Sequence, residues 1–348
     1  MTYAIMESDT FKLCRSDDYN YNFSKKNGYF ERWGKTKEDD PEYCGFGPEI
    51  VDMEISTICH QGCQHCYKSN TPNGKNMTFD TFKIIFDKLP NTITQIAFGI
   101  GDIGANPYLW KIMAYCREKG VIPNITINGD GLTDEIVGNL AKYCGAVAIS
   151  HYDDDVCFNA IKRLSNAGLK QINIHKLWSE QTWKDGFRLL DILRRQKDIR
   201  LAGLNAVVFL TLKQKGLRNT YTPVKGRVRY KALIRYALNH NLRIGMDSCA
   251  AALFAKAIED RPDKDKLLTM VDSCESTCMS VYVNVDGIMY PCSFAEGLPQ
   301  FKGINLLEVQ DFVKDAWMHP ETTDFRTNSI TSKDKNGCRN CQIYNLGG

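Results

Sequence analysis

The chain has 348 residues, of which 43% are hydrophobic, and 44 basic residues against 41 acidic ones give it a formal net charge of +3. It has no apolar run of the roughly 18 residues that a membrane-spanning helix needs, and Glu7 and Asp9 lie where a signal peptide would be basic and then apolar. We therefore expect a soluble, cytoplasmic protein without membrane contact, in which the 14 cysteines stay reduced unless a metal or catalysis uses them.

Short strand-like runs alternate with helical patterns from Ile50 onward. Six candidate strands cover residues 50–56, 94–99, 124–128, 146–150, 171–175 and 204–210. Six candidate helices cover residues 78–89, 107–119, 133–143, 156–167, 181–194 and 229–239. Because right-handed crossovers return each helix to the same sheet, this order predicts an α/β fold with a parallel sheet and helices outside it. Six such units form either an open sheet or a partial barrel.

Two further segments flank the unit formed by residues 50–240. Residues 1–49 are polar and rich in aromatic side chains, and we expect them to form an N-terminal extension that covers the next domain. Residues 241–348 hold six of the fourteen cysteines and a strand-turn-strand signal at 281–290 around Asp286-Gly287. They predict a second, smaller α+β domain.

A CxxxCxxC motif, formed by Cys59, Cys63 and Cys66, directly follows the first strand of the predicted sheet. Parallel α/β domains place their chemistry on such loops at the carboxyl ends of strands. Cysteine thiolates hold iron-sulfur clusters, and three of them leave the fourth iron of a cubane open to a ligand. The alternative is a structural zinc site that uses these thiols with His60 or His65.

This motif resembles that of the radical S-adenosylmethionine (radical SAM) superfamily. The resemblance implies that residues 50–240 form a partial (β/α)6 barrel and that the three cysteines bind a catalytic 4Fe-4S cluster. SAM would chelate the open iron. An electron from the cluster would cleave SAM to a 5′-deoxyadenosyl radical, which abstracts hydrogen from a substrate. The resemblance also implies a reducing partner such as a flavodoxin or ferredoxin.

Strand-end residues of the predicted sheet supply candidates for binding SAM. The second strand ends in Gly99-Ile100-Gly101-Asp102, where the family usually has Gly-Gly-Glu, so Gly99, Gly101 and Asp102 are candidates. The third strand ends with Asn128 and the fourth with Ser150, and polar residues at these ends bind SAM in the family. The alternative to SAM binding is an ordinary glycine-rich turn at residues 99–102 and an ordinary capping or turn role for Asn128 and Ser150.

Two histidines are weaker candidates for catalytic residues. His175 alternates with Asn173 on the fifth strand, so both face the same side of the sheet. His151 directly follows the fourth strand. A lone histidine on a strand is more often structural than catalytic.

Four cysteines in the second domain form two pairs, which is the complement for one fully ligated cluster. Twelve residues separate Cys274 from Gly287 and four more separate Gly287 from Cys292, while Cys338 and Cys341 form a CxxC pair. This pattern resembles the auxiliary-cluster domains called SPASM and Twitch, which implies a second 4Fe-4S cluster in residues 241–348.

Cys249 is an alternative to Cys338 as the fourth ligand, and a structural zinc ribbon is an alternative to the cluster. The cysteines without metal spacing are expected to be small buried hydrophobic residues. They are Cys14, Cys44, Cys116, Cys144 and Cys157.

Basic residues and tyrosines are concentrated at 213–235, with no acidic residue between Ile199 and Met246. The stretch is either a solvated basic face or a contact for an anionic substrate. The first hypothesis is a radical SAM enzyme that oxidises or rearranges a small molecule, a nucleotide or a peptide side chain. The alternative is a non-catalytic protein that binds zinc through the same cysteines and nucleic acid through residues 213–235.

Overall fold

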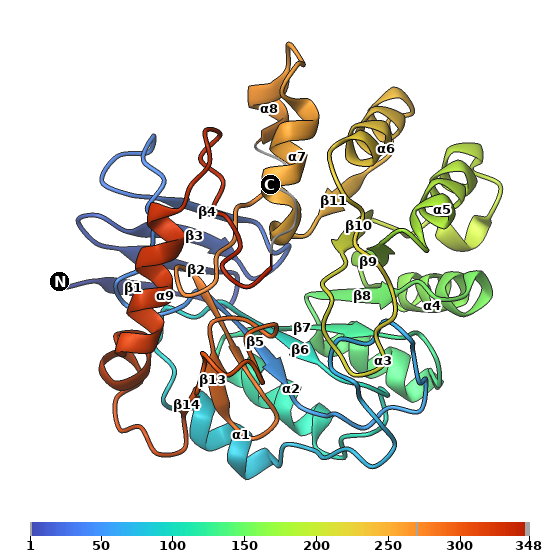
Figure 1. Cartoon of the computed structure of the whole chain (residues 1–348). Coiled ribbons are helices and arrows are strands. Elements are labelled where there is room, and N and C mark those ends of the chain that lie inside the picture. Colours follow the sequence, from blue (N-terminus) through green and yellow to red (C-terminus); the bar gives the residue numbers. More distant parts are fainter. Residues whose placement is uncertain (1, 269–270, 345–348) are drawn as a thin grey trace.

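The computed structural model describes residues 2–268 and 271–344, and its centre is a ten-stranded sheet in the order β11-β10-β9-β8-β7-β6-β5-β12-β13-β14 (Figure 1). Strands β5 to β10 are parallel, as the β/α pattern predicts. Their bounds are β5 Ile50–Glu54, β6 Gln95–Gly99, β7 Ile122–Ile127, β8 Ala146–Ser150, β9 Gln171–Trp178 and β10 Ala206–Thr211. The prediction of an α/β fold with a parallel sheet is confirmed.

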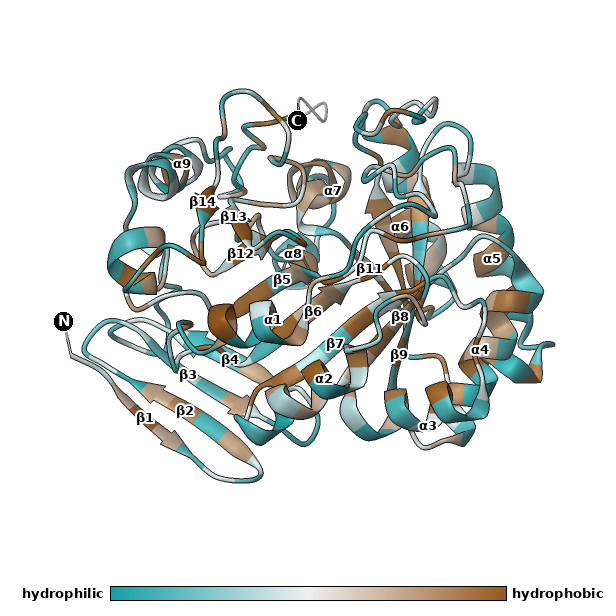
Figure 2. Ribbon diagram, turned by 90° about the horizontal axis from the view of Figure 1, so that it is seen from below, coloured by the Kyte–Doolittle hydropathy of each residue, from teal (hydrophilic) through white to brown (hydrophobic). Residues whose placement is uncertain are grey.

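Six helices follow these strands and cover the outer side of the curved sheet (Figure 1). They are α1 Phe79–Phe86, α2 Leu109–Glu118, α3 Asp134–Tyr143, α4 Asp154–Asn166, α5 Trp183–Arg195 and α6 Val228–Asn239. The hydroxyl of Thr78 caps α1 by accepting the Thr81 N–H at 3.1 Å, and Phe82 and Ile85 are fully buried beneath that helix. Figure 2 shows the hydrophobic strands enclosed by helices whose outer sides are hydrophilic.

A seventh parallel strand, β11 Ile244–Met246, extends the sheet beyond β10, and the sequence did not predict it. It has only three residues and contains Gly245, so its sequence shows no alternation of apolar and polar side chains. The chain continues into the 3-10 helix Ser248–Ala250 and into α7 Ala251–Ile258 and α8 Lys264–Leu268.

The C-terminal part joins the other edge of the same sheet. Strand β12 Ser280–Val283 pairs in parallel with β5, and β13 Ile288–Tyr290 returns antiparallel to β12, which confirms the predicted hairpin. Gly287 in the turn has φ +80°, a conformation that glycine adopts without strain. The remaining elements are β14 Ile304–Asn305, the π-helical turn Val313–Trp317 and α9 Pro320–Thr331.

The N-terminal residues form their own four-stranded antiparallel sheet from β1 Ala4–Glu7, β2 Phe11–Arg15, β3 Asn20–Ser24 and β4 Phe30–Trp33. The buried Lys12 ties this sheet to the main body by donating to the Ile93 carbonyl at 2.7 Å. All five cysteines that lack metal spacing are buried, as predicted. No helix within residues 2–268 and 271–344 combines the length and the apolar character needed to cross a membrane.

Candidate functional site

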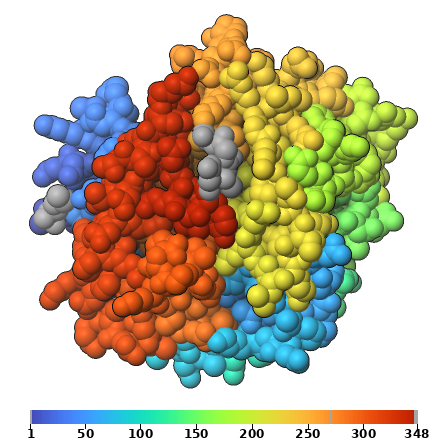
Figure 3. All heavy atoms as spheres, in the orientation of Figure 1, coloured from blue at the N-terminus to red at the C-terminus, as the bar shows by residue number. Residues whose placement is uncertain are grey.

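A cavity of about 820 Å³ opens at the carboxyl ends of the parallel strands and brings the two predicted groups of cysteines together. Its lining includes Cys59, Cys63, Cys66, Cys249, Cys274, Cys292 and Cys341. The C-terminal part and the stretch after β10 close over this face side by side (Figure 3), and Lys215 joins them by donating to the Glu296 carbonyl at 2.7 Å. The fold thus places seven thiols around one chamber.

The first three thiols lie on the loop after β5, which turns back on itself. The Cys59 N–H donates to the Thr71 carbonyl at 3.0 Å, and the Cys66 N–H donates to the Cys63 carbonyl at 3.2 Å. Burial raises the pKa of Cys59 and Cys63, and the neighbouring Cys66 raises that of Cys63 further. Because burial favours neutral thiols here, a bound cationic metal centre is what would stabilise three thiolates together.

The turn after β6 supports this cysteine loop from beneath. The Asp102 N–H donates to the Ile58 carbonyl at 2.9 Å, and the Asp102 carboxylate accepts the His60 N–H at 3.0 Å and contacts His60 Nδ1 at 2.6 Å. Asp102 is not among the residues that line the cavity. Asp102 thus contacts the loop that carries the cysteines, and its expected contact with SAM stays a prediction.

Gly101 allows the turn after β6 to lie close against the cysteine loop. We expect Gly101→Ala to disturb that loop. A Cβ atom at this position would lie 2.7 Å from the Cys59 Cβ and closer still to the Ile58 carbonyl oxygen, so backbone would have to move. We expect a loss of about 2 kcal/mol or more in the free energy of unfolding and a lower iron content after anaerobic reconstitution. Thermal unfolding and iron analysis measure these effects.

Gly99→Ala is the matched control, because its added Cβ would meet its nearest neighbour, Glu54 Cα, at an ordinary 3.6 Å. It should retain iron like the unaltered chain. Equal iron contents and unfolding temperatures for the two variants would contradict the supporting role of Gly101.

Asn128 and Ser150 both line the cavity, at the ends of β7 and β8 where the sequence placed them. The Asn128 side chain also accepts the Asp130 N–H at 3.0 Å. Tyr152, which sequence reasoning missed, lines the cavity two residues after Ser150. Burial and the neighbouring Cys63 raise the pKa of Tyr152, while a contact with Ser150 partly offsets them. A polar side chain two residues beyond a strand end was the only sequence signal for it.

The two candidate histidines lie in different surroundings. His175 lines the cavity, and burial lowers its pKa to about 4, although Asp247 partly offsets this effect. His151 is buried, with Nε2 2.8 Å from Asp154 Oδ1 and Nδ1 2.9 Å from Lys176 Nζ, and it does not line the cavity. His175 therefore remains a candidate, whereas His151 belongs to a structural network of charged groups.

Four of the C-terminal cysteines share the cavity, but Cys338 does not. Cys338 is 6% exposed and packs with Ala251 and Ala255. In contrast, Cys249 is close enough to Cys274 and Cys341 for both to raise its pKa, after burial as the main cause. The placement of the thiols thus favours Cys249, the alternative, over Cys338 as the fourth ligand, and this choice stays a prediction.

The pKa of Cys292 supports the same grouping of thiols. Burial raises it to about 11, and Cys274 and Cys341 contribute to the increase.

No three His, Cys, Asp or Glu side chains in the described ranges are arranged to hold a single metal ion. The irons of a cluster stand apart from one another, so their ligands are spaced more widely than those of a single ion.

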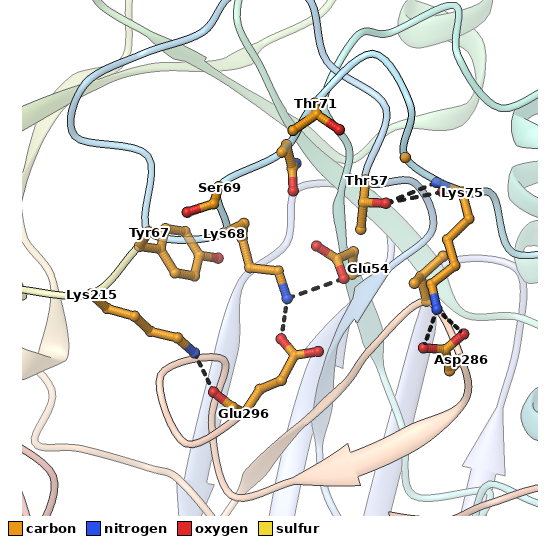
Figure 4. A pocket seen from close by; sticks show the side chains of 13 residues that line it. Glu54, Thr57, Tyr67, Lys68, Ser69, Thr71, Lys75, Lys215, Asp286 and Glu296 are labelled. Atoms are coloured by element: carbon orange, nitrogen blue, oxygen red, sulfur yellow. Dashed lines mark hydrogen bonds and ion pairs between the residues drawn. The ribbon is translucent and has the colours of Figure 1, made fainter. Parts of the chain in front are cut away.

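A smaller cavity of about 410 Å³ lies beside the cysteine loop, and a buried network of charges crosses it (Figure 4). Lys68, two residues after Cys66, pairs with Glu54 at 3.1 Å and with Glu296, and donates to the Tyr282 hydroxyl at 2.7 Å. The network joins the cysteine loop to β5, β12 and the segment after Cys292. It therefore fixes the two groups of thiols relative to each other.

The basic stretch 213–235 is largely engaged within the protein. Lys213 pairs with Asp247, Arg229 with Glu180 and Lys231 with Asp260 at 2.8 Å. Arg218 donates to the Asn70 carbonyl at 2.8 Å. These contacts do not favour the alternative of a basic surface for nucleic acid.

The Radical SAM superfamily profile matches residues 53–196. A curated relative, the tungsten-containing aldehyde ferredoxin oxidoreductase cofactor-modifying protein of Pyrococcus furiosus, is 29% identical over 94 residues, which are 26% of each protein. The chain thus matches about a quarter of this relative's length.

Solved structures resemble the fold over most of the chain. SuiB of Streptococcus suis bound to S-adenosylmethionine has a TM-score of 0.65 at 16% identity, covering 84% of this chain and 71% of that one. SuiB bound to precursor peptide SuiA has a TM-score of 0.71 at 13% identity, covering 96% and 93%. The anSMEcpe protein with bound AdoMet and a peptide has a TM-score of 0.57 at 15% identity, covering 79% and 82%. Residues 53–196 thus match the radical SAM superfamily, and the solved structures share the fold of the chain.

Proposed function

We propose that this protein is a radical SAM enzyme with one catalytic and one auxiliary 4Fe-4S cluster. The observation that carries the proposal is the single cavity shared by the CxxxCxxC loop and by a second set of four thiols. When bound, the catalytic cluster and SAM supply an electron transfer that yields a 5′-deoxyadenosyl radical, which abstracts hydrogen from the substrate.

Cys59, Cys63 and Cys66 would hold the catalytic cluster, with three thiolates for four irons. Asn128 and Ser150 would bind SAM, together with the backbone of Gly99 and Gly101. All four line the cavity beside the cysteine loop, which supports this assignment.

Cys249, Cys274, Cys292 and Cys341 would hold the auxiliary cluster, and four thiolates would ligate it fully. We assign residues 241–348 to a domain of the SPASM or Twitch type, residues 50–240 to the radical SAM partial barrel and residues 1–49 to an N-terminal extension. The substrate would occupy the cavity between the two groups of thiols.

The chain's own residues would exclude water and form hydrogen bonds in the cavity. The lining includes apolar side chains from β9, β10 and β11, namely Leu177, Val208, Leu210 and Met246. With its lowered pKa, His175 is neutral near pH 7, so its imidazole would offer the substrate one hydrogen-bond donor and one acceptor.

For the substrate we favour a peptide side chain over a small molecule or a nucleotide, because two of the structural relatives were solved with peptides. The reaction would be an oxidation or a rearrangement. The electron would come from a reducing partner such as a flavodoxin or ferredoxin.

Anaerobic purification followed by metal and product analysis tests the proposed function. We expect a brown protein with about eight irons per chain, the sum of two cubanes, that forms 5′-deoxyadenosine when dithionite and SAM are added. A colourless protein that holds only zinc and leaves SAM intact would overturn the proposal in favour of the zinc-binding alternative.

A further inference from the structure

A carboxylate projects into the cavity from the middle of the main sheet. Strand β5 alternates its side chains, so Ile50, Asp52 and Glu54 point to the same side, and all three line the cavity. In the sheet, Asp52 lies opposite Ala97 of β6 and Tyr282 of β12. Its side chain is exposed, and the space it faces is the cavity.

Asp52 has no hydrogen bond or ion pair among the described residues, in contrast to its neighbour Glu54, which pairs with Lys68 and accepts the Tyr282 hydroxyl at 3.2 Å. The four basic side chains that line the cavity each have another partner. Lys68 pairs with Glu54 and Glu296, Lys213 with Asp247, and Arg218 and Arg339 donate at 2.8 Å to the carbonyls of Asn70 and Cys274.

Five acidic side chains and four lysine or arginine side chains line the cavity, so its lining has a small excess of negative charge. Glu275 and Asp272 line the same space, and Glu275 pairs with Arg32 at 3.2 Å. Burial raises the pKa of Asp52 to about 6, and the nearby Glu275 adds to this effect. A carboxylate that faces the cavity without a partner is able to form a charge-assisted hydrogen bond with a cation that enters the cavity.

We propose that Asp52 receives a positively charged nitrogen of the substrate, a protonated amine or a guanidinium. This inference rests on the proposed function, because it places the substrate in the cavity between the two groups of thiols. Asp52 is then a residue that determines specificity. It would select lysine-like or arginine-like groups over neutral groups of the same length, since only a cation compensates the carboxylate.

Binding of small probes to the anaerobic, cluster-loaded protein with SAM tests the inference. The probes are N-acetyl-lysinamide, N-acetyl-argininamide and the uncharged N-acetyl-norleucinamide, with dissociation constants measured by ligand-observed NMR. We expect at least one cationic probe to bind about tenfold more tightly than the norleucine derivative, a difference typical of one desolvated charge pair. Asp52→Asn should remove this preference.

Two controls separate a lost contact from a damaged fold. Asp9→Asn makes the same change of charge at an exposed position outside the cavity, and it should leave the preference unchanged. Asp52→Asn should keep its affinity for SAM and should not unfold at a lower temperature, because the carboxylate that it replaces has no partner among the described residues.

Equal binding of charged and neutral probes by the unaltered chain would overturn the inference, as would an unchanged preference in Asp52→Asn or a loss of SAM affinity in that variant. A different result would contradict the proposed function itself: the unaltered chain would then hold no iron and form no 5′-deoxyadenosine.

Discussion

Replacing Cys63 by alanine should reduce the formation of 5′-deoxyadenosine to background and lower the iron content from about eight to about four per chain, because one of two cubanes is lost. Cys63 lies on the loop after β5 and lines the cavity with Cys59 and Cys66. Two thiolates would leave a second iron without a protein ligand, so the cluster would not persist. Iron analysis and chromatography of the SAM reaction products measure both effects.

Cys157→Ala is the matched control for this experiment. Cys157 lies on α4, is 1% exposed and does not line the cavity. Its replacement leaves a small void and should cost about 1 kcal/mol of stability, without affecting iron content or SAM cleavage. SAM cleavage at the normal rate by Cys63→Ala would show that the thiol is not a ligand of the catalytic cluster.

The parallel sheet was predictable because each of its units carries a local signal. Apolar runs of strand length followed by helical periodicity identify β5 to β10 and α1 to α6, and their ends agree with the structure to within a few residues. The strand β11 was not predicted, because three residues are too few to show an alternation of apolar and polar side chains. The parallel pairing of β12 with β5 joins residues about 230 positions apart, a contact that no local pattern encodes.

The residues of the candidate site also fall into two groups, those that a local sequence pattern reveals and those that depend on the tertiary structure. The spacing of Cys59, Cys63 and Cys66 is local, so the sequence revealed it directly. The fourth thiol of the second set depends on tertiary structure: a CxxC pair favoured Cys338, but the fold packs that side chain against α7, whereas Cys249 follows the unpredicted β11 into the cavity.

Residues that position the site were the hardest to predict. Asp102 matches a motif that points to SAM, but its carboxylate binds His60, 42 residues earlier in the chain. Lys68 reaches Glu296 across the interface between the cysteine loop and the C-terminal part. Such roles depend on which loops meet, and that is decided by the packing of the whole fold.

Replacing Cys249 by alanine should lower the iron content by about half, the share of one of two cubanes, and spare SAM cleavage in the absence of substrate. The same replacement at Cys338 should leave the iron content unchanged. Cys249 lines the cavity with Cys274, Cys292 and Cys341, whereas Cys338 is buried against Ala251 and Ala255 outside it. Each of the two variants serves as the control for the other, because both remove one sulfur atom from the same part of the chain.

Thermal unfolding of both variants distinguishes ligand loss from misfolding, since Cys338→Ala removes a buried side chain and should lower the unfolding temperature by a few degrees. Electron paramagnetic resonance of the reduced proteins should show two cluster signals for Cys338→Ala and one for Cys249→Ala. The reverse outcome, with iron lost from Cys338→Ala and retained by Cys249→Ala, would restore the CxxC pair as the ligand set. It would also require Cys338 to leave its packing against α7 when the cluster binds.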